Sequence, residues 1–365
     1  MVWIISVLAV IALAGVLFVK LYPGIADFSA SAEDRADYSA RAANFDGSAF
    51  QNEHDFQMMQ RVEKGAADGI VSAKGTTPQE HIPTMTPTWK ADPAEDELSF
   101  TWLGHSSLLI QMQGMNILFD PVFSEYASPV SFTGNKRFSD VPMSMEDIPE
   151  IDILILTHDH YDHLDRATIT ALDSRVKQYV VPLGVEYRLT RFGVSREKIT
   201  NMAWWEELEI HGLTVACTPA RHYTGRYMID GGKTLWASFV LKDEHHLVFE
   251  SGDTGYDTHF DQIHEKYGDF DLVFMDGAQY DLRWPSVHMN PEEAGAAVRT
   301  LGAEYAVPIH WGTFRLANHP WDDSVVRLVL ALDGSGVPVI TPQIGETVTL
   351  EEIDQFQTRW YETIQ

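Results

Sequence analysis

The amino-acid sequence predicts a mixed α/β domain behind an apolar N-terminal segment. Short apolar segments typical of strands come first, and later strand patterns alternate with helix patterns, as in α/β domains. The composition agrees, because 45% of the 365 residues are hydrophobic and 22% are charged, which is typical of a globular protein with a sizeable core.

The N-terminus predicts a membrane anchor. Residues 2–19 are apolar except for Ser6 and carry no charge. At ~1.5 Å per helical residue they span about 27 Å, close to the hydrocarbon thickness of a bilayer. A signal peptide usually has a basic start and a shorter apolar part, whereas Lys20 follows this run. We expect residues 1–21 to be an uncleaved helix in a bacterial inner membrane, on an undetermined side. A cleaved signal and a buried core helix are the alternatives.

Residues 22–97 are expected to form a connector and an N-terminal arm. Residues 30–41 and 50–64 carry helix patterns, and the four prolines of 76–93 favour an extended chain. We expect this arm to lie over the main domain, residues 98–350, with 351–365 as a C-terminal tail.

The main domain carries separate strand and helix patterns. The helix after Asn290 has an N-cap residue, a proline in the first turn and two glutamates, all of which favour a helix start. The predicted helices are 166–173, 185–192 and 291–301. The predicted strands are 100–103, 107–112, 116–121, 151–157, 213–217, 246–252 and 306–309.

Charge and cysteine content exclude several classes. A net charge of −27 repels nucleic acid, and the sequence has no basic run that would offset it. The one cysteine, Cys217, excludes disulfides within the chain and a Cys-rich zinc site. We expect Cys217 to be a buried member of its apolar strand.

Histidines and aspartates gather directly after the strand pattern at 151–157. Beside a core such groups must be paired or coordinated, because burying them without partners is costly. His158 and His160 are two residues apart and point the same way in extended chain. Asp162 and His163 follow closely enough to reach a second metal. The alternative is a solvated polar loop, which the density of the run disfavours.

Three more candidate ligands follow apolar strands: His222, Asp253 and His310. Each is a weak signal alone, since a single histidine there is more often structural and Asp253 can form a turn. Together with the run they supply seven ligands. We expect His158, His160 and His222 on one metal and Asp162, His163 and His310 on the other, with Asp253 as the bridge. These ligands suit two Zn²⁺ ions best, with Mn²⁺ or Fe as alternatives.

The pattern His-x-His-x-Asp-His, followed by isolated His, Asp and His, resembles the metallo-β-lactamase fold superfamily. Within it, residues 98–350 resemble N-acylphosphatidylethanolamine-hydrolysing phospholipase D and its bacterial relatives. The matching segments are 100–105, 120–124, 127–129, 136–138, 162–165, 181–184, 204–207, 252–256, 291–294 and 309–314.

The resemblance implies a four-layer αβ/βα sandwich with a dinuclear site at one edge of its sheets. It implies that Asp120 hydrogen-bonds to a ligand histidine and fixes its tautomer. The alternative for Asp120 is a turn before Pro121. It also implies that His288 is an active-site histidine that donates a proton or stabilises phosphoryl charge, with surface or capping roles as alternatives. His105 is expected to pack or support a ligand.

This chain departs from the family near that histidine. Val287 stands where the phospholipase has glutamine, and residues 275–281 are more acidic. The substrate is therefore not carried over with the resemblance. Tyr280, Trp284 and residues 204–205 are candidates for a lipid-accommodating wall or for core aromatics.

We expect a membrane-anchored, metal-dependent hydrolase. The preferred reaction is cleavage of a phospholipid diester by a hydroxide held by two metals, with Asp162 orienting the nucleophile and His288 near the leaving group. A lactonase or another ester or amide hydrolase, β-lactam cleavage included, is the enzyme alternative. A membrane-tethered metal or lipid sensor without turnover is the non-enzyme alternative. The sequence does not determine the oligomeric state.

Overall fold

The computed structural model describes residues 30–55, 58–60, 75–226 and 230–364, together with Ser6, Leu13 and Gly15. The predicted membrane segment lies outside these residues apart from the three single ones, so it stays a prediction. Among the described residues, no helix has both the length and the apolar character needed to cross a bilayer.

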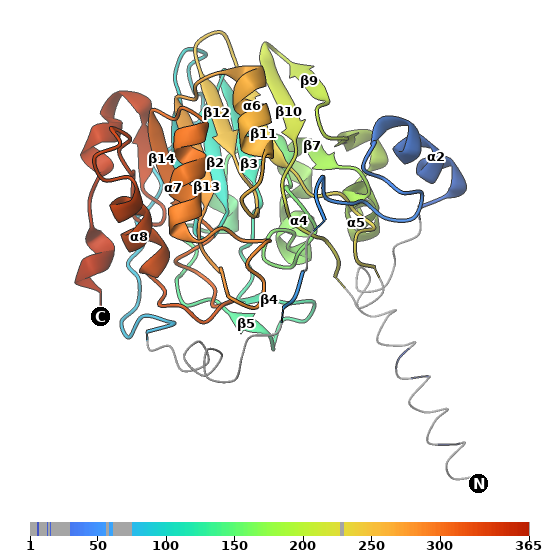
Figure 1. The fold of residues 1–365 in the computed structure, drawn as a ribbon, viewed down its shortest axis with the longest axis horizontal. Helices are drawn as coiled ribbons and strands as arrows, with labels where there is room; N and C mark the ends of the chain where they lie inside the picture. Colours follow the sequence, from blue (N-terminus) through green and yellow to red (C-terminus); the bar gives the residue numbers. More distant parts are fainter. Residues whose placement is uncertain are drawn as a thin grey trace.

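Two mixed sheets form the centre of the fold (Figure 1). The first has the order β15-β1-β2-β3-β6-β7-β8, with strands Thr347–Thr349, Ser99–Trp102, Leu108–Met112, Met115–Phe119, Ile151–Ile155, Val176–Pro182 and Ile199–Met202. The second has the order β14-β13-β12-β11-β10-β9, with strands Tyr305–Ile309, Leu272–Asp276, Leu247–Glu250, Ser238–Lys242, Leu213–Thr218 and Glu207–Ile210. A small ribbon of β4 (Tyr126–Ala127) and β5 (Asn135–Lys136) lies beyond one end of the strands, below them in Figure 1.

Both faces of each sheet are buried over the central strands, which explains why these strands are continuous apolar runs, whereas the edge strand β9 alternates exposed glutamates with partly buried apolar residues. In β2, Leu108 and Ile110 belong to the core between the two sheets, whereas Leu109 belongs to the core under the helices. Across the inner core the rings of Phe100 and Phe274 meet edge to face, with centroids 5.0 Å apart. Successive side chains along a strand therefore pack into the two different cores, and this packing holds the layers together.

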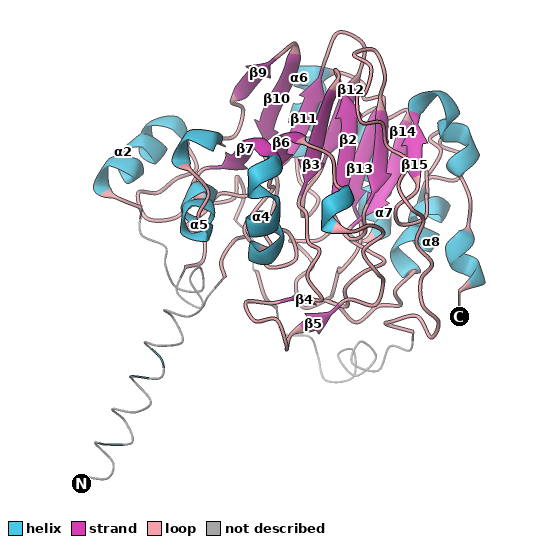
Figure 2. Cartoon of the chain, turned by 180° about the vertical axis from the view of Figure 1, so that it is seen from behind, coloured by secondary structure: helices cyan, strands magenta, loops and turns pink. Residues whose placement is uncertain are grey.

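Helices cover the two outer faces. α4 (Arg166–Leu172) and α5 (Val185–Phe192) pack on the first sheet, and Figure 2 shows them in front of it. α6 (His259–Tyr267), α7 (Pro291–Thr300) and α8 (Asp323–Ala331) pack on the second sheet. The predicted α/β sandwich with four layers is confirmed, as are the three predicted helices. Asn290 caps α7 by accepting from the backbone N–H groups of Glu292 and Glu293.

The N-terminal arm packs on the sandwich. α2 (Ala32–Arg41) confirms the predicted helix there, and its Tyr38 hydroxyl donates to Glu186 at 2.6 Å. The helix predicted at 50–64 is wrong for residues 50–55 and 58–60, which form no helix. Their backbone groups bond across the molecule instead, because Phe50 N–H donates to Gly232 and Gln60 N–H donates to Arg283. Residues 56–57 and 61–64 lie outside the described part of the chain.

The C-terminal residues pack against the same core. Two 3₁₀ helices, η4 (Leu350–Phe356) and η5 (Trp360–Thr363), follow β15. The indole of Trp360 stacks on that of Trp311 with ring centroids 5.7 Å apart. The tail therefore supports the end of β14, where His310 immediately precedes Trp311.

Because His259 is buried, we expect the folded chain to lose stability in acid. Burial lowers the pKa of this histidine to about 3, even though Asp257 raises it. Between about pH 6.5 and pH 3 the unfolded chain therefore binds a proton that the folded chain does not, and the free energy of unfolding falls as the pH falls. One such group contributes a slope of about 1.4 kcal/mol per pH unit.

Urea unfolding at pH 7, 5.5 and 4.5 tests this contribution. We expect H259Q to show a shallower loss of stability with acid than the parent chain, whatever its stability at pH 7. H81Q changes an exposed histidine and is the control. Equal slopes for H259Q and the parent would contradict the assignment.

Candidate dinuclear metal centre

Four strand ends bring the predicted ligands together. The loop after β6 carries residues 158–163, while His222, Asp253 and His310 follow β10, β12 and β14. The sheets approach closely here, since a Cβ on Gly252 would lie 2.7 Å from the Ala237 carbonyl oxygen and 3.0 Å from Thr157. The positive φ of 54° at Gly252 also favours glycine. The turn before Asp253 is therefore set by close contact with the Ala237 backbone of its own sheet and with the Thr157 side chain of the other.

Three imidazoles and one carboxylate form the first cluster. His160 Nδ1 lies 2.8 Å from His158 Nε2 and 3.3 Å from His222 Nε2. Asp253 Oδ2 lies 3.6 Å from His158 Nε2 and 3.7 Å from His222 Nε2. Ligand atoms about 2.0 Å from a tetrahedral zinc are roughly 3.3 Å apart. The four ligand atoms therefore have the spacing of one metal site.

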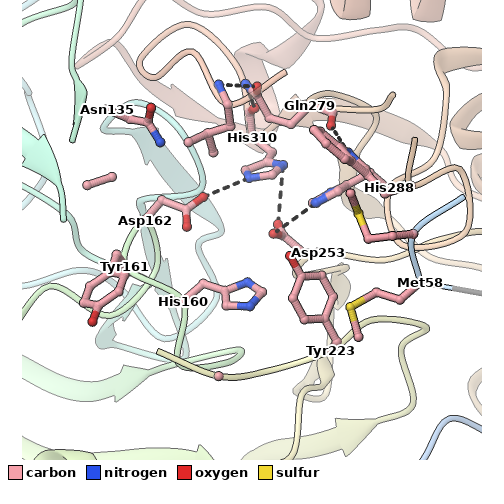
Figure 3. Close-up of a pocket in the computed structure, with 15 residues that line it drawn as sticks. Met58, Asn135, His160, Tyr161, Asp162, Tyr223, Asp253, Gln279, His288 and His310 are labelled. Atoms are coloured by element: carbon pink, nitrogen blue, oxygen red, sulfur yellow. Dashed lines mark hydrogen bonds and ion pairs between the residues drawn. The ribbon is translucent and has the colours of Figure 1, made fainter. Parts of the chain in front are cut away.

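The second cluster adjoins the first. His163 Nε2 lies 3.5 Å from Asp162 Oδ2, and His310 Nε2 lies 3.3 Å from the same oxygen. Asp253 Oδ1 lies 3.1 Å from His163 Nε2. The two oxygens of Asp253 thus face different clusters, which is the geometry of the predicted bridge. Figure 3 shows four of these side chains around one cavity: His160, Asp162, Asp253 and His310.

Buried polar atoms with unmet hydrogen-bonding capacity support metal binding. Asp253 Oδ1 and His163 Nε2 are buried and face each other at 3.1 Å, but neither makes a hydrogen bond of good geometry within the described part of the chain. Burial alone would lower the pKa of His163, but Asp253, Asp162 and Asp120 raise it well above its ordinary value. A proton on His163 thus offsets carboxylate charge in the metal-free chain. Since metals bind deprotonated ligands, a divalent ion would replace such protons. The residues fit a pair of divalent cations.

An outer set of hydrogen bonds fixes the ligand rings. Asp120 Oδ2 accepts from His163 Nδ1 at 2.7 Å, as the resemblance implied. The Thr157 hydroxyl donates to Asp120 at 2.6 Å and lies 3.0 Å from His158 Nδ1, from which it accepts. The Val287 carbonyl accepts from His222 Nδ1 at 2.9 Å. Each ring therefore presents Nε2 to the cluster.

His105 supports Asp162, as expected. Its Nε2 lies 2.9 Å from Asp162 Oδ2. Burial, together with the charge of His310, lowers the pKa of His105 to about 4, so this ring is neutral at pH 7. Its Nε2–H donates a hydrogen bond to the Asp162 carboxylate. His105, Asp120 and His310 all have positive φ, of 54°, 39° and 65°. Such strained backbone is typical of functional sites.

His288 lies beside the clusters, and Asp276 holds it. His288 Nδ1 lies 3.1 Å from Asp276 Oδ2, and its Nε2 lies 4.0 Å from Asp253 Oδ2. Asp276 was not among the predicted site residues, although it ends the apolar strand β13 just as the other candidates follow apolar strands. Its position at the end of an apolar strand was the sequence signal that could have identified Asp276 as a site residue.

The N-terminal arm contributes to the same cavity, which the sequence did not predict. The Asn52 side chain donates to the His222 carbonyl at 2.7 Å and accepts from the His222 N–H at 3.1 Å. Met58 and Met59 line the cavity, whose volume is about 370 Å³. Gln60 fixes this end of the arm through its backbone N–H and its side chain, which bond to residues 283 and 282.

Asp159, within the metal-motif run, forms ion pairs instead of facing a cluster. Arg188 Nε donates to Asp159 Oδ2 at 3.0 Å, and Arg188 Nη2 donates to Asp230 Oδ2 at 2.5 Å. Asp159 Oδ1 accepts from the Gly225 N–H at 3.0 Å. This buried network joins the loop of residues 158–163 to the loop that follows His222.

The family described as the Beta-lactamase superfamily domain matches residues 115–311, more than half of the chain. The chain belongs to the β-lactamase superfamily. An uncharacterized protein of Mycobacterium tuberculosis is 38% identical over 284 residues, which cover 76% of each chain. N-acyl-phosphatidylethanolamine-hydrolyzing phospholipase D 1 of Caenorhabditis elegans is 36% identical and covers 60% of this chain and 65% of its own length. The mitochondrial enzyme of that name from Saccharomyces cerevisiae is 30% identical over 73% of this chain and 58% of its own.

Solved structures share the superfamily fold. A metallo hydrolase from Ignicoccus hospitalis has a TM-score of 0.53 at 22% identity and covers 69% of this chain and 98% of its own. An isothiocyanate hydrolase from Delia radicum gut bacteria has a TM-score of 0.54 at 19% identity and covers 68% and 98%. With its His/Asp clusters able to bind metals, this superfamily member is a metal-dependent hydrolase.

The aromatic candidates divide into two groups. Trp284 lines the cavity of the clusters, and Tyr280 lines a neighbouring one that also contains His288. Trp204 is instead buried in the core, where its indole N–H donates to the Trp236 carbonyl. Of these aromatics, Trp284 is the one placed to touch a substrate beside the clusters.

Proposed function

We propose that this chain is a dinuclear zinc phosphodiesterase that cleaves the headgroup diester of membrane phospholipids, anchored by residues 2–19. The observation that carries the proposal is the arrangement of Asp253 between two ligand clusters on the wall of one cavity, with His288 beside them. Seven residues would hold the two ions: His158, His160, Asp162, His163, His222, Asp253 and His310. The similarity to enzymes named as phospholipases D favours a phosphodiester over a carbonyl substrate.

The bound ions would supply a nucleophile at neutral pH and neutralise the charge that grows on phosphoryl oxygens. Asp162, held by His105 and close to His310, would orient the nucleophile. His288 turns its Nε2 toward the clusters because its Nδ1 bonds to Asp276, so it is placed to donate a proton to the leaving oxygen or to stabilise phosphoryl charge.

The rim of the cavity favours a substrate with long apolar chains. A cavity of about 370 Å³ suits a headgroup better than a whole two-chain lipid. The chains would then lie outside it, where Met58 and Met59 are 44% and 56% exposed. Leu282, bonded through its carbonyl to Gln60, is also exposed at 55%. Exposed apolar side chains at a cavity mouth suit contact with lipid.

A substrate panel with purified, metal-loaded chain tests the proposed function. The panel contains N-acylated and ordinary phospholipids, cyclic nucleotides and lactones. We expect the highest kcat/KM on a phospholipid, with release of a phosphatidic acid. Faster lactone turnover would overturn the phosphodiesterase assignment in favour of the ester hydrolase. Stoichiometric binding of metal and lipid without product would favour the sensor.

The two rim methionines provide a separate prediction. A bound lipid chain that covers the exposed half of one methionine gains roughly 1 kcal/mol of binding free energy. M58S/M59S should therefore lose about 10-fold or more in kcat/KM on long-chain phospholipid. Activity on a short, water-soluble phosphodiester should stay the same. M85S is the matched control, because Met85 is also 44% exposed and does not line the cavity. Equal losses on both substrates would contradict a chain-binding role.

A further inference from the structure

Asp276 joins two histidines that come from different parts of the fold. It is fully buried at the end of β13. Its Oδ1 lies 3.2 Å from His310 Nδ1, and its Oδ2 lies 3.1 Å from His288 Nδ1. The backbone N–H of Ala278 donates to Oδ1 and that of Thr254 donates to Oδ2. Each oxygen therefore serves one imidazole and one backbone group.

The charge of Asp276 determines which way these hydrogen bonds run. Both of its oxygens accept a backbone N–H, from Ala278 and from Thr254, so both act as acceptors in this structure. An ionised carboxylate only accepts, so both imidazoles donate from Nδ1. Their Nε2 atoms are then available to the site. His310 Nε2 lies 3.3 Å from Asp162 Oδ2, and His288 Nε2 lies 4.0 Å from Asp253 Oδ2.

The two rings also stack and share a neighbour. Their centroids are 5.0 Å apart and their planes differ by 22°. Thr254, whose N–H donates to Asp276, directly follows Asp253. One side chain thus fixes His288, His310 and the backbone beside the proposed bridging carboxylate.

We propose that Asp276 is a positioning residue that couples His288 to the metal ligand His310 by holding both rings in the tautomer that presents Nε2 to the cavity. This inference rests on the proposed two-metal site and adds the residue that makes His288 part of it. It does not depend on which diester or ester is the substrate.

D276N is the informative substitution because it keeps the shape and removes one acceptor. The amide oxygen accepts from one ring, while the NH₂ group faces the Nδ1 of the other ring and forces that nitrogen to accept. The proton of that ring then moves to Nε2. If the ring is His310, its Nε2 no longer binds metal. If it is His288, its Nε2 changes its hydrogen-bonding role toward the substrate.

We expect D276N to lose about 10- to 100-fold in second-metal affinity or in kcat, with KM within about twofold of the parent. Chelator competition measures the metal affinity without a substrate, so failure of the phosphodiester panel leaves this readout intact. E250Q is the matched control. Glu250 is also a fully buried carboxylate, at the end of the neighbouring strand β12, and hydrogen-bonds to neither histidine.

The double variant D276N/H288Q separates an effect of Asp276 through His288 from an effect through the proposed metal ligand His310. If Asp276 acts on catalysis through His288, D276N lowers kcat much less in an H288Q background than in the parent chain. Equal losses in both backgrounds, with unchanged metal affinity, would overturn the coupling. Metal affinity and kcat both equal to those of E250Q would overturn the whole inference.

A measurement on the unmodified chain covers the case in which D276N does not fold. In the zinc-loaded chain labelled with ¹⁵N-histidine, NMR should find a proton on Nδ1 of His288, assigned by the loss of that signal in H288Q. A His288 ring protonated only at Nε2 would contradict the proposed hydrogen bond to Asp276.

Discussion

Replacing His160 with alanine is expected to reduce turnover by about 10³-fold or more and to release metal from the first cluster. His160 Nδ1 lies within 3.3 Å of the facing nitrogens of both His158 and His222, so the substitution removes one of three nitrogen ligands. A metal that contributes about 4 kcal/mol to the transition state corresponds to a 10³-fold effect on rate.

The fold should survive the change. His160 lies in a loop at the cavity and is only half-buried. The loss of bound metal will itself lower stability by mass action, so H160A is compared with the metal-free parent chain. Equal free energies of unfolding for these two are expected. H81A, at an exposed histidine, is the control for the substitution. Full turnover of H160A with unchanged metal content would remove His160 from the site.

Among the charged side chains of the described residues, we expect the loss of Arg188 to lower the free energy of unfolding most. Its guanidinium is fully buried between Asp159 and Asp230. Replacing it with methionine leaves two buried carboxylates without this partner, and breaking a buried pair costs about 3–5 kcal/mol. We expect R188M to lower the free energy of unfolding by that amount. Metal affinity should fall too, because the network joins the loop that carries four of the seven ligands to the loop that follows a fifth ligand, His222.

Two further variants sharpen this prediction. R191M removes a charge from an exposed position on the same helix and should change stability by no more than about 0.5 kcal/mol. R188M/D159N/D230N removes the charges together and should recover much of the stability that R188M loses. Equal stability of R188M and R191M by urea unfolding would contradict the importance of the buried network.

The sequence predicted the strands and helices well because their signal is local, whereas the four layers were implied by the family resemblance. The apolar runs of the strands and the capping of α7 follow from neighbouring residues. The seven candidate ligands were predicted for the same reason, since each lies just beyond an apolar strand. Asp276 carries the same signal, but the acidic segment around it was interpreted only as a sign of a different substrate.

The contacts of the arm had no such local signal. Asn52 is 170 residues from His222, and nothing near either residue predicts the two hydrogen bonds between them. The predicted helix is absent from the described residues 50–55 and 58–60, where backbone bonds to Gly232 and Arg283 are made instead. Tertiary contacts thus determined both the shape of the arm and its place beside the cavity.

Metal content measured together with turnover tests the central claim most directly. Elemental analysis of the purified chain, before chelation, after it and after adding zinc back, should give two ions per chain, then none, then two. Turnover should disappear and return with the metal. Unchanged turnover of the fully metal-depleted chain would contradict a two-metal hydrolase.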